Sequence, residues 1–302
     1  LTDAGYDSTV TVSCYDVLGL IAQNTIPADW SDNYITSLNP THYWRMNKTI
    51  DPSGLPTTST ALASYTFDDV GTGNAPMVPL LESRPISNCD PLGLAVVGNA
   101  ISFSNGATPW ADGRAYSGLT GNPIFTFASW HTFQDSARTT APIVFQGNFL
   151  ISGQYSTVSL DYDMTNQRFE VYIAPYAASS TYRMYYYNTG LNIAVAHHIA
   201  ITMTLTSTNT ATISALIVDG VVLTQTSTTT FTKPPTTGLT YATLSLGEGS
   251  NQQIILHEGS EWSTTQLRTI YQLGNNVLTE TTAARFSRVI AQTCLLYTSD
   301  AA

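Results

Sequence analysis

Short hydrophobic runs that alternate with polar residues dominate the middle of the chain. Each run is rich in Val, Ile, Phe, Tyr and Thr and is bounded by Gly, Pro, Asn or Asp. A period of two puts every second side chain on one face, as in a strand that is buried on one side. The runs lie at 100–103, 125–130, 142–145, 158–162, 168–173, 198–203 and 212–218. Their close spacing predicts an antiparallel sandwich or barrel rather than alternating strands and helices.

The clearest local signal is a β-hairpin around Asp219-Gly220. This dipeptide lies between two runs of β-branched residues, 216–218 and 221–223, and it supplies the positive φ angles of a type I′ turn. The Thr-rich tract 224–232 follows, and a Lys-Pro-Pro sequence comes directly after it. Because proline cannot donate a hydrogen bond to a sheet, we expect this tract to end the second arm and to form an exposed connection.

Three segments break the strand rhythm and have the pattern of helices. Asp16 is a candidate N-cap for a short helix. Ser263 and Gln266 have the spacing of a capping box, and the apolar residues that follow have helical spacing up to Gly274. A third helical stretch covers 282–291. We therefore expect a mostly β chain with short helical flanks.

Composition and charge exclude several classes of protein. The 302 residues are 43% hydrophobic and 11% charged, which is too apolar for a disordered chain, and the mean hydropathy is -0.00. No apolar run approaches the roughly 18 residues of a spanning helix, so membrane insertion is not expected. The net charge of -10 argues against nucleic acid as a partner. Cys14, Cys89 and Cys294 lie far apart, which excludes a zinc cluster or a dense disulfide framework.

Four strings follow one another in an order that is informative. They are HYWRMN at 42–47, FTFASW at 125–130, AHHIAIT at 196–202 and VDGV at 218–221. In this order they resemble strands of laminin G-like, concanavalin A-like modules, in which the third string usually begins with Trp rather than Ala196. The resemblance covers roughly residues 39–273. It implies an all-β, two-sheet antiparallel jelly-roll sandwich (concanavalin A-like) with short helical flanks.

The two flanks resemble a different kind of protein. The segment 10–20 is similar to the end of the upstream domain in minor tail proteins of tailed bacteriophages, and 280–290 is similar to the segment that follows an inserted laminin G-like module there. This resemblance implies a piece of an upstream domain at 1–30, the sandwich at 31–276 and the start of a further domain at 277–294. Residues 295–302 resemble a translated sequencing adapter and are predicted to be non-native.

A loop of the predicted sandwich holds a candidate calcium site. Calcium prefers several oxygen ligands from loops, and laminin G-like modules often hold one at the rim of the sandwich. The candidate ligands are Asp68, Asp69 and Asn74, in a loop whose glycines would let carbonyl oxygens turn inward. The alternative is an ordinary acidic turn without a cation.

Two segments hold candidates for carbohydrate recognition, which needs aromatic faces to stack on sugar rings and polar groups to orient hydroxyls. The first segment contributes Trp110, Asp112 and Arg114, and the second contributes Tyr182, Arg183 and Tyr185. The alternative is that the tyrosines pack inward as ordinary strand residues.

Carboxylate pairs for catalysis are present but weakly indicated. A glycoside hydrolase needs two carboxylates across a cleft, and Asp161 and Asp163 share one face of a predicted strand. The favoured alternative is a solvated strand end beside a turn. Glu258 and Glu261 form a second candidate pair. No known nucleophile or nucleotide-binding motif occurs, and the chain is predicted not to be an enzyme.

The adjacent His197 and His198 are the most conspicuous histidines of the chain. Neighbouring residues of a strand point to opposite faces, so the two cannot hold one metal ion without a bulge. We expect one of them to be packed and the other exposed.

The combined prediction is a non-enzymatic structural protein of a phage tail, part of the virion. It would display a laminin G-like module that binds host-surface glycans, and other tail proteins would be its further partners. One alternative is a secreted or cell-surface carbohydrate-binding adhesion module of cellular origin, which would be extracellular. The other alternative is a glycoside hydrolase of concanavalin A-like fold.

Overall fold

The computed structural model describes most of the middle of the chain. The described residues are 30–47, 67–80, 86–89, 100–103, 114–133, 142–151, 153–175, 180–187, 190–207, 210–232, 243–246 and 249–275. The predicted flanking domain pieces and the two predicted helices at 16–22 and 282–291 lie outside them. Within the described part, no helix is long and apolar enough to span a membrane.

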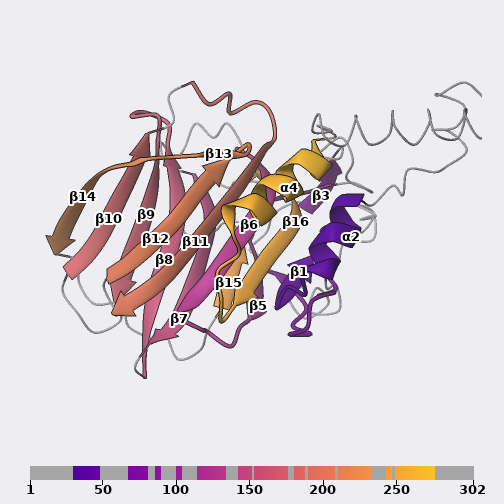
Figure 1. Ribbon diagram of the computed structural model, residues 1–302, viewed down its shortest axis with the longest axis horizontal. Helices are drawn as coiled ribbons and strands as arrows, with labels where there is room; N and C mark the ends of the chain where they lie inside the picture. Colours follow the sequence, from indigo (N-terminus) through magenta and orange to yellow (C-terminus); the bar gives the residue numbers. More distant parts are fainter. Residues whose placement is uncertain are drawn as a thin grey trace, which may run out of the picture.

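Two antiparallel sheets form the body of the protein (Figure 1). The first sheet runs in the order β13 (Val221–Val222), β12 (Thr210–Val218), β11 (His197–Ser207), β6 (Ile124–Thr132), β16 (Gly249–Glu258), β4 (Ala100–Phe103) and β3 (Ile86–Cys89), with β1 (His42–Trp44) also pairing with β16. The second runs in the order β14 (Gln225–Thr232), β10 (Ser180–Tyr187), β9 (Arg168–Pro175), β8 (Gln154–Asp163), β7 (Ile143–Ile151), β15 (Thr243–Leu246), β5 (Arg114–Gly118) and β2 (Val78–Leu80).

The core lies between the sheets and follows from the period-two pattern. On β6, Phe125 and Phe127 face the second sheet, where Phe125 stacks on Phe149 with ring centroids 4.0 Å apart. Phe127 stacks on Phe145 in the same way, at 4.2 Å. Burying aromatic rings of this size supplies much of the free energy that holds two sheets together. The prediction of an all-β, two-sheet antiparallel jelly-roll sandwich is therefore confirmed.

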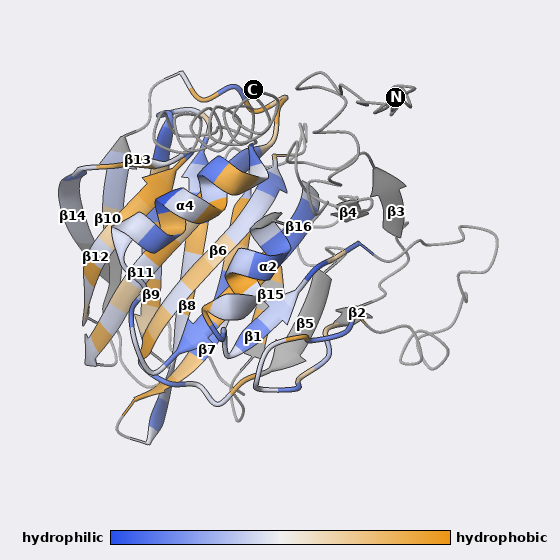
Figure 2. Ribbon diagram, turned by 45° about the vertical axis from the view of Figure 1, so that its right-hand side comes forward, coloured by the Kyte–Doolittle hydropathy of each residue, from blue (hydrophilic) through white to orange (hydrophobic). Residues whose placement is uncertain are grey.

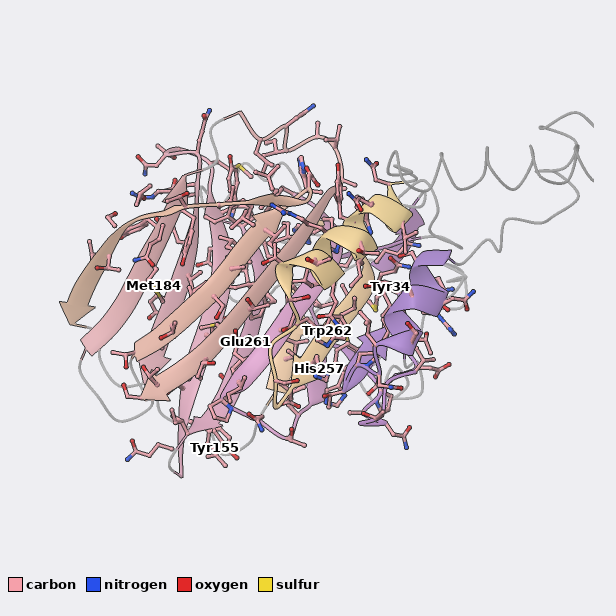
Figure 3. All side chains as sticks on the ribbon, viewed as in Figure 1. Tyr34, Tyr155, Met184, His257, Glu261 and Trp262 are labelled. Carbon is pink, nitrogen blue, oxygen red and sulfur yellow. The ribbon has the colours of Figure 1, made fainter. Side chains whose placement is uncertain are left out.

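Two helices cover the outer face of the first sheet. They are α2 (Trp30–Ser37), which lies beside β1, and α4 (Thr264–Gly274), which lies over β6 and β16 (Figures 1 and 2). Figure 3 shows Tyr34 of α2 on the same side as Trp262 and His257, whose rings stack 5.3 Å apart. A second hydrophobic cluster beneath the helices includes Trp262 and Leu267. In the described part of the chain, no helix covers the outer face of the second sheet.

Two of the local predictions are confirmed and one is wrong. The capping box of α4 is present, because the Ser263 side chain accepts from Gln266 N and the Gln266 side chain accepts from Ser263 N. The Asp219-Gly220 hairpin is present as β12 and β13, with positive φ angles of 49° and 77° at the two turn residues. The Thr-rich tract, however, is not a connection. It forms β14, because β10 provides hydrogen-bonding partners along most of its length.

Candidate functional site

The outer face of the second sheet is polar across several neighbouring strands. Side chains that point away from the core come from alternate positions of β7, β8, β9 and β10. One row of register partners crosses these strands as Gln146, Ser159, Tyr172 and Arg183. The Gln146 and Tyr172 side chains are half-buried and Ser159 is buried. This row therefore combines an amide, a hydroxyl and an aromatic ring on one rigid surface.

Two carboxylates stand opposite each other in the next row. Asp161 of β8 is the register partner of Glu170 of β9. Directly paired residues of antiparallel strands have their Cβ atoms roughly 5 Å apart, so the two side chains leave the sheet side by side. Asp161 is half-buried, whereas Glu170 is 4% exposed. The sequence-based pairing of Asp161 with Asp163 missed this arrangement, because it depends on the register between two strands.

Arg168 holds the edge of this carboxylate cluster in place. Its Nε and Nη2 donate to Glu170 Oε1 over 3.1 and 2.8 Å, and its Nη2 lies 3.5 Å from Asp163 Oδ2. The guanidinium also lies over the ring of Tyr185, 3.9 Å from the centroid, which adds a cation–π attraction. Arg168 thus neutralises part of the acidic charge on this face and covers one side of the Tyr185 ring.

Asp163 is engaged by the turn that follows β8. It accepts hydrogen bonds from the backbone of Thr165 and from the backbone and side chain of Asn166. Burial alone would raise the pKa of Asp163, but these hydrogen bonds and the charge of Arg168 lower it below its usual value. The residue is 9% exposed, so Asp163 closes a turn rather than forming the expected solvated strand end.

The predicted saccharide-binding residues are only partly described. Trp110 and Asp112 lie outside the described residues. Arg114 is the first residue of β5, and Tyr182 and Arg183 lie on β10, but only their backbone positions are described. Tyr185 is 8% exposed, and its hydroxyl lies 2.8 Å from Thr229 Oγ1. Register places Arg183 beside Tyr172 and Tyr185 beside Glu170 on the polar face, whereas Tyr182 is the partner of the core residue Ile173.

The predicted calcium ligands lie in one turn but have different surroundings. Asp68 and Asn74 are exposed. The Asp69 carboxylate accepts from the backbone N–H groups of Tyr43, Gly71 and Ala75, at 2.8 to 2.9 Å. These three hydrogen bonds hold the Asp69 side chain in place, as in an ordinary acidic turn. Among the described residues there is no group of three or more His, Cys, Asp or Glu side chains that could hold a metal ion. Calcium at this turn stays a prediction.

Asp69 also belongs to a buried charge cluster around His42. His42 Nδ1 lies 2.7 Å from Asp69 Oδ2, and His42 Nε2 lies 3.3 Å from Glu258 Oε2. Burial would lower the pKa of His42, but the two carboxylates outweigh it and raise this pKa to about 9. A Cβ atom at position 73 would overlap the His42 ring, so only glycine fits there. Glu258 is thus a structural partner of His42.

Both adjacent histidines are buried, which corrects the expectation that one of them is exposed. His197 is 6% and His198 is 1% exposed. They do point to opposite faces: His197 contacts Asp219 Oδ2 at 2.6 Å, whereas His198 packs against Trp130 beneath α4. His198 is buried rather than exposed because it lies under α4. Asp219 therefore anchors His197 in addition to forming its hairpin turn.

Glu258 and Glu261, the second predicted carboxylate pair, do not form one site. Glu258 accepts from Thr120 and Asn122 as well as contacting His42, while Glu261 accepts from Thr204 Oγ1 at 3.0 Å. Each carboxylate has its own set of partners. The pair on the outer face of the second sheet is therefore the better candidate for chemistry on a ligand.

Comparison with known proteins finds solved structures of low similarity. No family model and no curated protein matches the chain. Two solved structures of Trypanosoma rangeli sialidase, one with sialic acid and one with a difluorinated analogue, are 13% identical with TM-scores of 0.46 and 0.45. They cover 86% of this chain, which spans only 40% of theirs. A family 7 alginate lyase in complex with substrate is 12% identical with a TM-score of 0.30, over 72% of this chain and 90% of the lyase.

These comparisons bear on two of the predictions. The similar structures fit the broader part of the predicted resemblance, a concanavalin A-like domain. The prediction that the chain is not an enzyme is contradicted, because the similar structures are a sialidase and a lyase, both of them enzymes that act on carbohydrates. At identities of 12 to 13%, the likeness concerns the fold, and the substrates named belong to those proteins.

Proposed function

We propose that this protein binds saccharides on the outer face of the second sheet. The observation that carries the proposal is the row of Gln146, Ser159 and Tyr172, in register on three neighbouring strands of a face that no described helix covers. Saccharide binding needs an aromatic face with hydrogen-bonding groups beside it. Tyr172 offers the ring, while the amide, the hydroxyl and the Asp161 carboxylate offer donors and acceptors at fixed spacings.

The test is a binding measurement with a matched pair of tyrosine variants. Tyr172→Ala is expected to weaken the binding of a responsive oligosaccharide about tenfold or more, because it removes the ring and its contact area. Tyr34→Ala is the control, since Tyr34 lies on α2 at the other side of the sandwich (Figure 3). Calorimetry with a panel of neutral, amino and uronic oligosaccharides would supply the affinities.

The outcomes of this binding test are distinct. Weaker binding in Tyr172→Ala with unchanged binding in Tyr34→Ala supports the proposal, provided that both variants melt at similar temperatures. Equal affinities in all three proteins would place any saccharide site elsewhere. A panel without a single binding sugar would contradict the proposal as a whole.

A second candidate function is cleavage of a glycan on the same face. It is favoured by the direct register of Asp161 with Glu170. Retaining glycosidases hold two carboxyl groups about 5 Å apart, and the Cβ atoms of cross-strand partners have a similar separation. If the chain cleaves a glycan here, Glu170→Gln is expected to slow the reaction about a thousandfold.

Asp163→Asn is the matched control for the glycan-cleavage test, because Asp163 carries a similar charge on the same face but is held by its turn. Release of reducing ends from the oligosaccharide panel would measure both variants. An unchanged rate in Glu170→Gln would exclude this pair as the reacting carboxylates.

The biological setting is proposed from the sequence of the flanks. The resemblance of 10–20 and 280–290 to phage minor tail proteins supports display on a virion tail, with host-surface glycans as the ligands. A secreted or cell-surface module of cellular origin is the alternative setting. Sequencing the full reading frame would separate them, because a tail protein and a secreted module carry different flanking segments.

A further inference from the structure

The Thr-rich strand β14 is the last strand of the second sheet at its β10 side. Among the described strands, it has β10 on one side and no neighbour on the other (Figure 1). Its sequence, QTSTTTFT, has eight residues without a charge or a proline. Residues 225–229 are all exposed. A strand in this position presents a row of backbone N–H and C=O groups that suit another strand.

The other described sheet edges have the features that usually prevent such pairing. β13 has two residues and β3 has four, so both are too short to template a long strand. β2 has three residues, and the middle one is Pro79, which cannot donate to a neighbour. A bulge at Thr226 disturbs only the start of β14 and leaves 227–232 regular. β14 is therefore the long and unprotected edge of the described sandwich.

β14 itself carries no charge that would oppose the approach of a second copy. The chain has a net charge of -10, so most surfaces of two copies repel each other. β14 has no charged residue, and threonine pairs well with threonine across antiparallel strands. A two-fold axis between the two strands, level with Thr229, would place Thr228 of each copy opposite Thr230 of the other.

We propose that β14 pairs antiparallel with β14 of a second copy, so that the chain forms a symmetric dimer through this edge. The two eight-stranded second sheets would then join into one continuous sheet. Because the two-fold axis of such a pairing stands perpendicular to the sheet, the outer faces of both copies point to the same side.

This geometry has a consequence for ligand binding, which rests on the proposed function. Two saccharide-binding faces on one side of a continuous sheet can bind neighbouring sugars of one surface together. The second binding event becomes intramolecular, so the overall affinity for a dense glycan surface exceeds that of each face. The dimer itself is tested without any sugar, so its failure and the failure of the saccharide proposal are distinguishable.

The experiment compares two lysine variants of the full chain by analytical ultracentrifugation over a wide range of concentration. Thr228→Lys puts a charge in the regular part of β14, where Thr228 is exposed and pairs with Met184 of β10. The dimer dissociation constant is expected to rise about tenfold or more, because like charges from the two copies then meet. Thr224→Lys adds the same charge at an exposed position before the strand and should leave the dimer intact.

Hydrogen exchange identifies the interface independently. The amides of 227–232 should exchange more slowly at concentrations where the wild-type dimer forms, and this protection should vanish in Thr228→Lys. Melting curves check that both variants are folded. A monomer at every concentration would overturn the proposal, and so would a dimer that persists in Thr228→Lys without protection of β14.

Discussion

Acidification from pH 6.5 to pH 4 is expected to lower the free energy of unfolding by about 6 kcal/mol through two buried histidines. Burial lowers the pKa of His131 and of His198 to about 4, whereas histidine in an unfolded chain titrates near 6.5. Between these pH values the unfolded chain binds protons that the folded chain does not bind, so stability falls with falling pH. Each histidine accounts for about 3 kcal/mol, at roughly 1.36 kcal/mol per pH unit.

The two histidines differ in their surroundings, which makes them a useful pair of variants. His131 Nδ1 lies 3.0 Å from Asn251 Oδ1. Among the described residues, neither ring nitrogen of His198 has a hydrogen-bond partner, and the ring packs against Trp130 and Tyr271 instead. His198→Phe is therefore expected to keep the packing and to remove about half of the acid sensitivity. His131→Phe should remove a similar part but also cost the bond to Asn251.

Denaturant unfolding at a series of pH values measures these effects as the slope of unfolding free energy against pH. The wild type should show the steepest slope between pH 6.5 and 4, and each variant a shallower one. A slope that neither substitution changes would mean that other groups control the acid response of the protein.

Local signals predicted the elements of this fold where a few neighbouring residues decide the conformation. The Asp219-Gly220 turn and the Ser263 capping box depend on positions no more than three apart, and both are present. The Thr-rich tract 224–232 was predicted as a connection because its composition and the prolines after it favour a loop. Its strand conformation depends on β10, some forty residues earlier in the chain, which pairs with it.

The part of the candidate site that the sequence could not predict depends on the register between neighbouring strands. Asp161 and Asp163 share a face by strand periodicity, but Asp163 is used by the following turn. Glu170 becomes the neighbour of Asp161 only through the pairing of β8 with β9. The alternation of polar residues along β9, with Glu170 and Tyr172 on one face, was the signal that could have pointed to it.

The cluster of His42, Asp69 and Glu258 carries the second large expected effect, because it joins parts of the chain that are far apart in sequence. His42 is on β1, Asp69 follows in a turn, and Glu258 ends β16. The side chains of all three are at most 3% exposed. Hydrogen bonds to the carboxylates lower the pKa of Asp69 and of Glu258 despite their burial. His42 therefore acts as a buried cation between two anions.

Raising the pH from 6.5 to 9 is expected to lower the free energy of unfolding by about 3 kcal/mol through His42 alone. Its pKa of about 9 in the folded protein lies above the unfolded value, so its stabilisation is complete below pH 6.5 and is lost as the pH rises through 9. His42→Gln should remove this alkaline loss, and should be less stable than the wild type at pH 6.5 because two buried carboxylates lose their cation.

His197→Gln is the matched control for the alkaline measurement. Burial would lower the pKa of His197, but its contacts with Asp219 and the Asn192 carbonyl raise it, so this variant removes another histidine with a raised pKa and leaves the Asp69–Glu258 pair intact. It should retain the share of the alkaline loss that belongs to His42. An equal loss of stability in His42→Gln and in the wild type would show that the cluster does not control this response. Protonation of the buried His131 and His198 lowers the stability below pH 6.5, and deprotonation of His42 lowers it above pH 6.5. Maximal stability is therefore expected near pH 6.5, which is also the best pH for measuring saccharide binding.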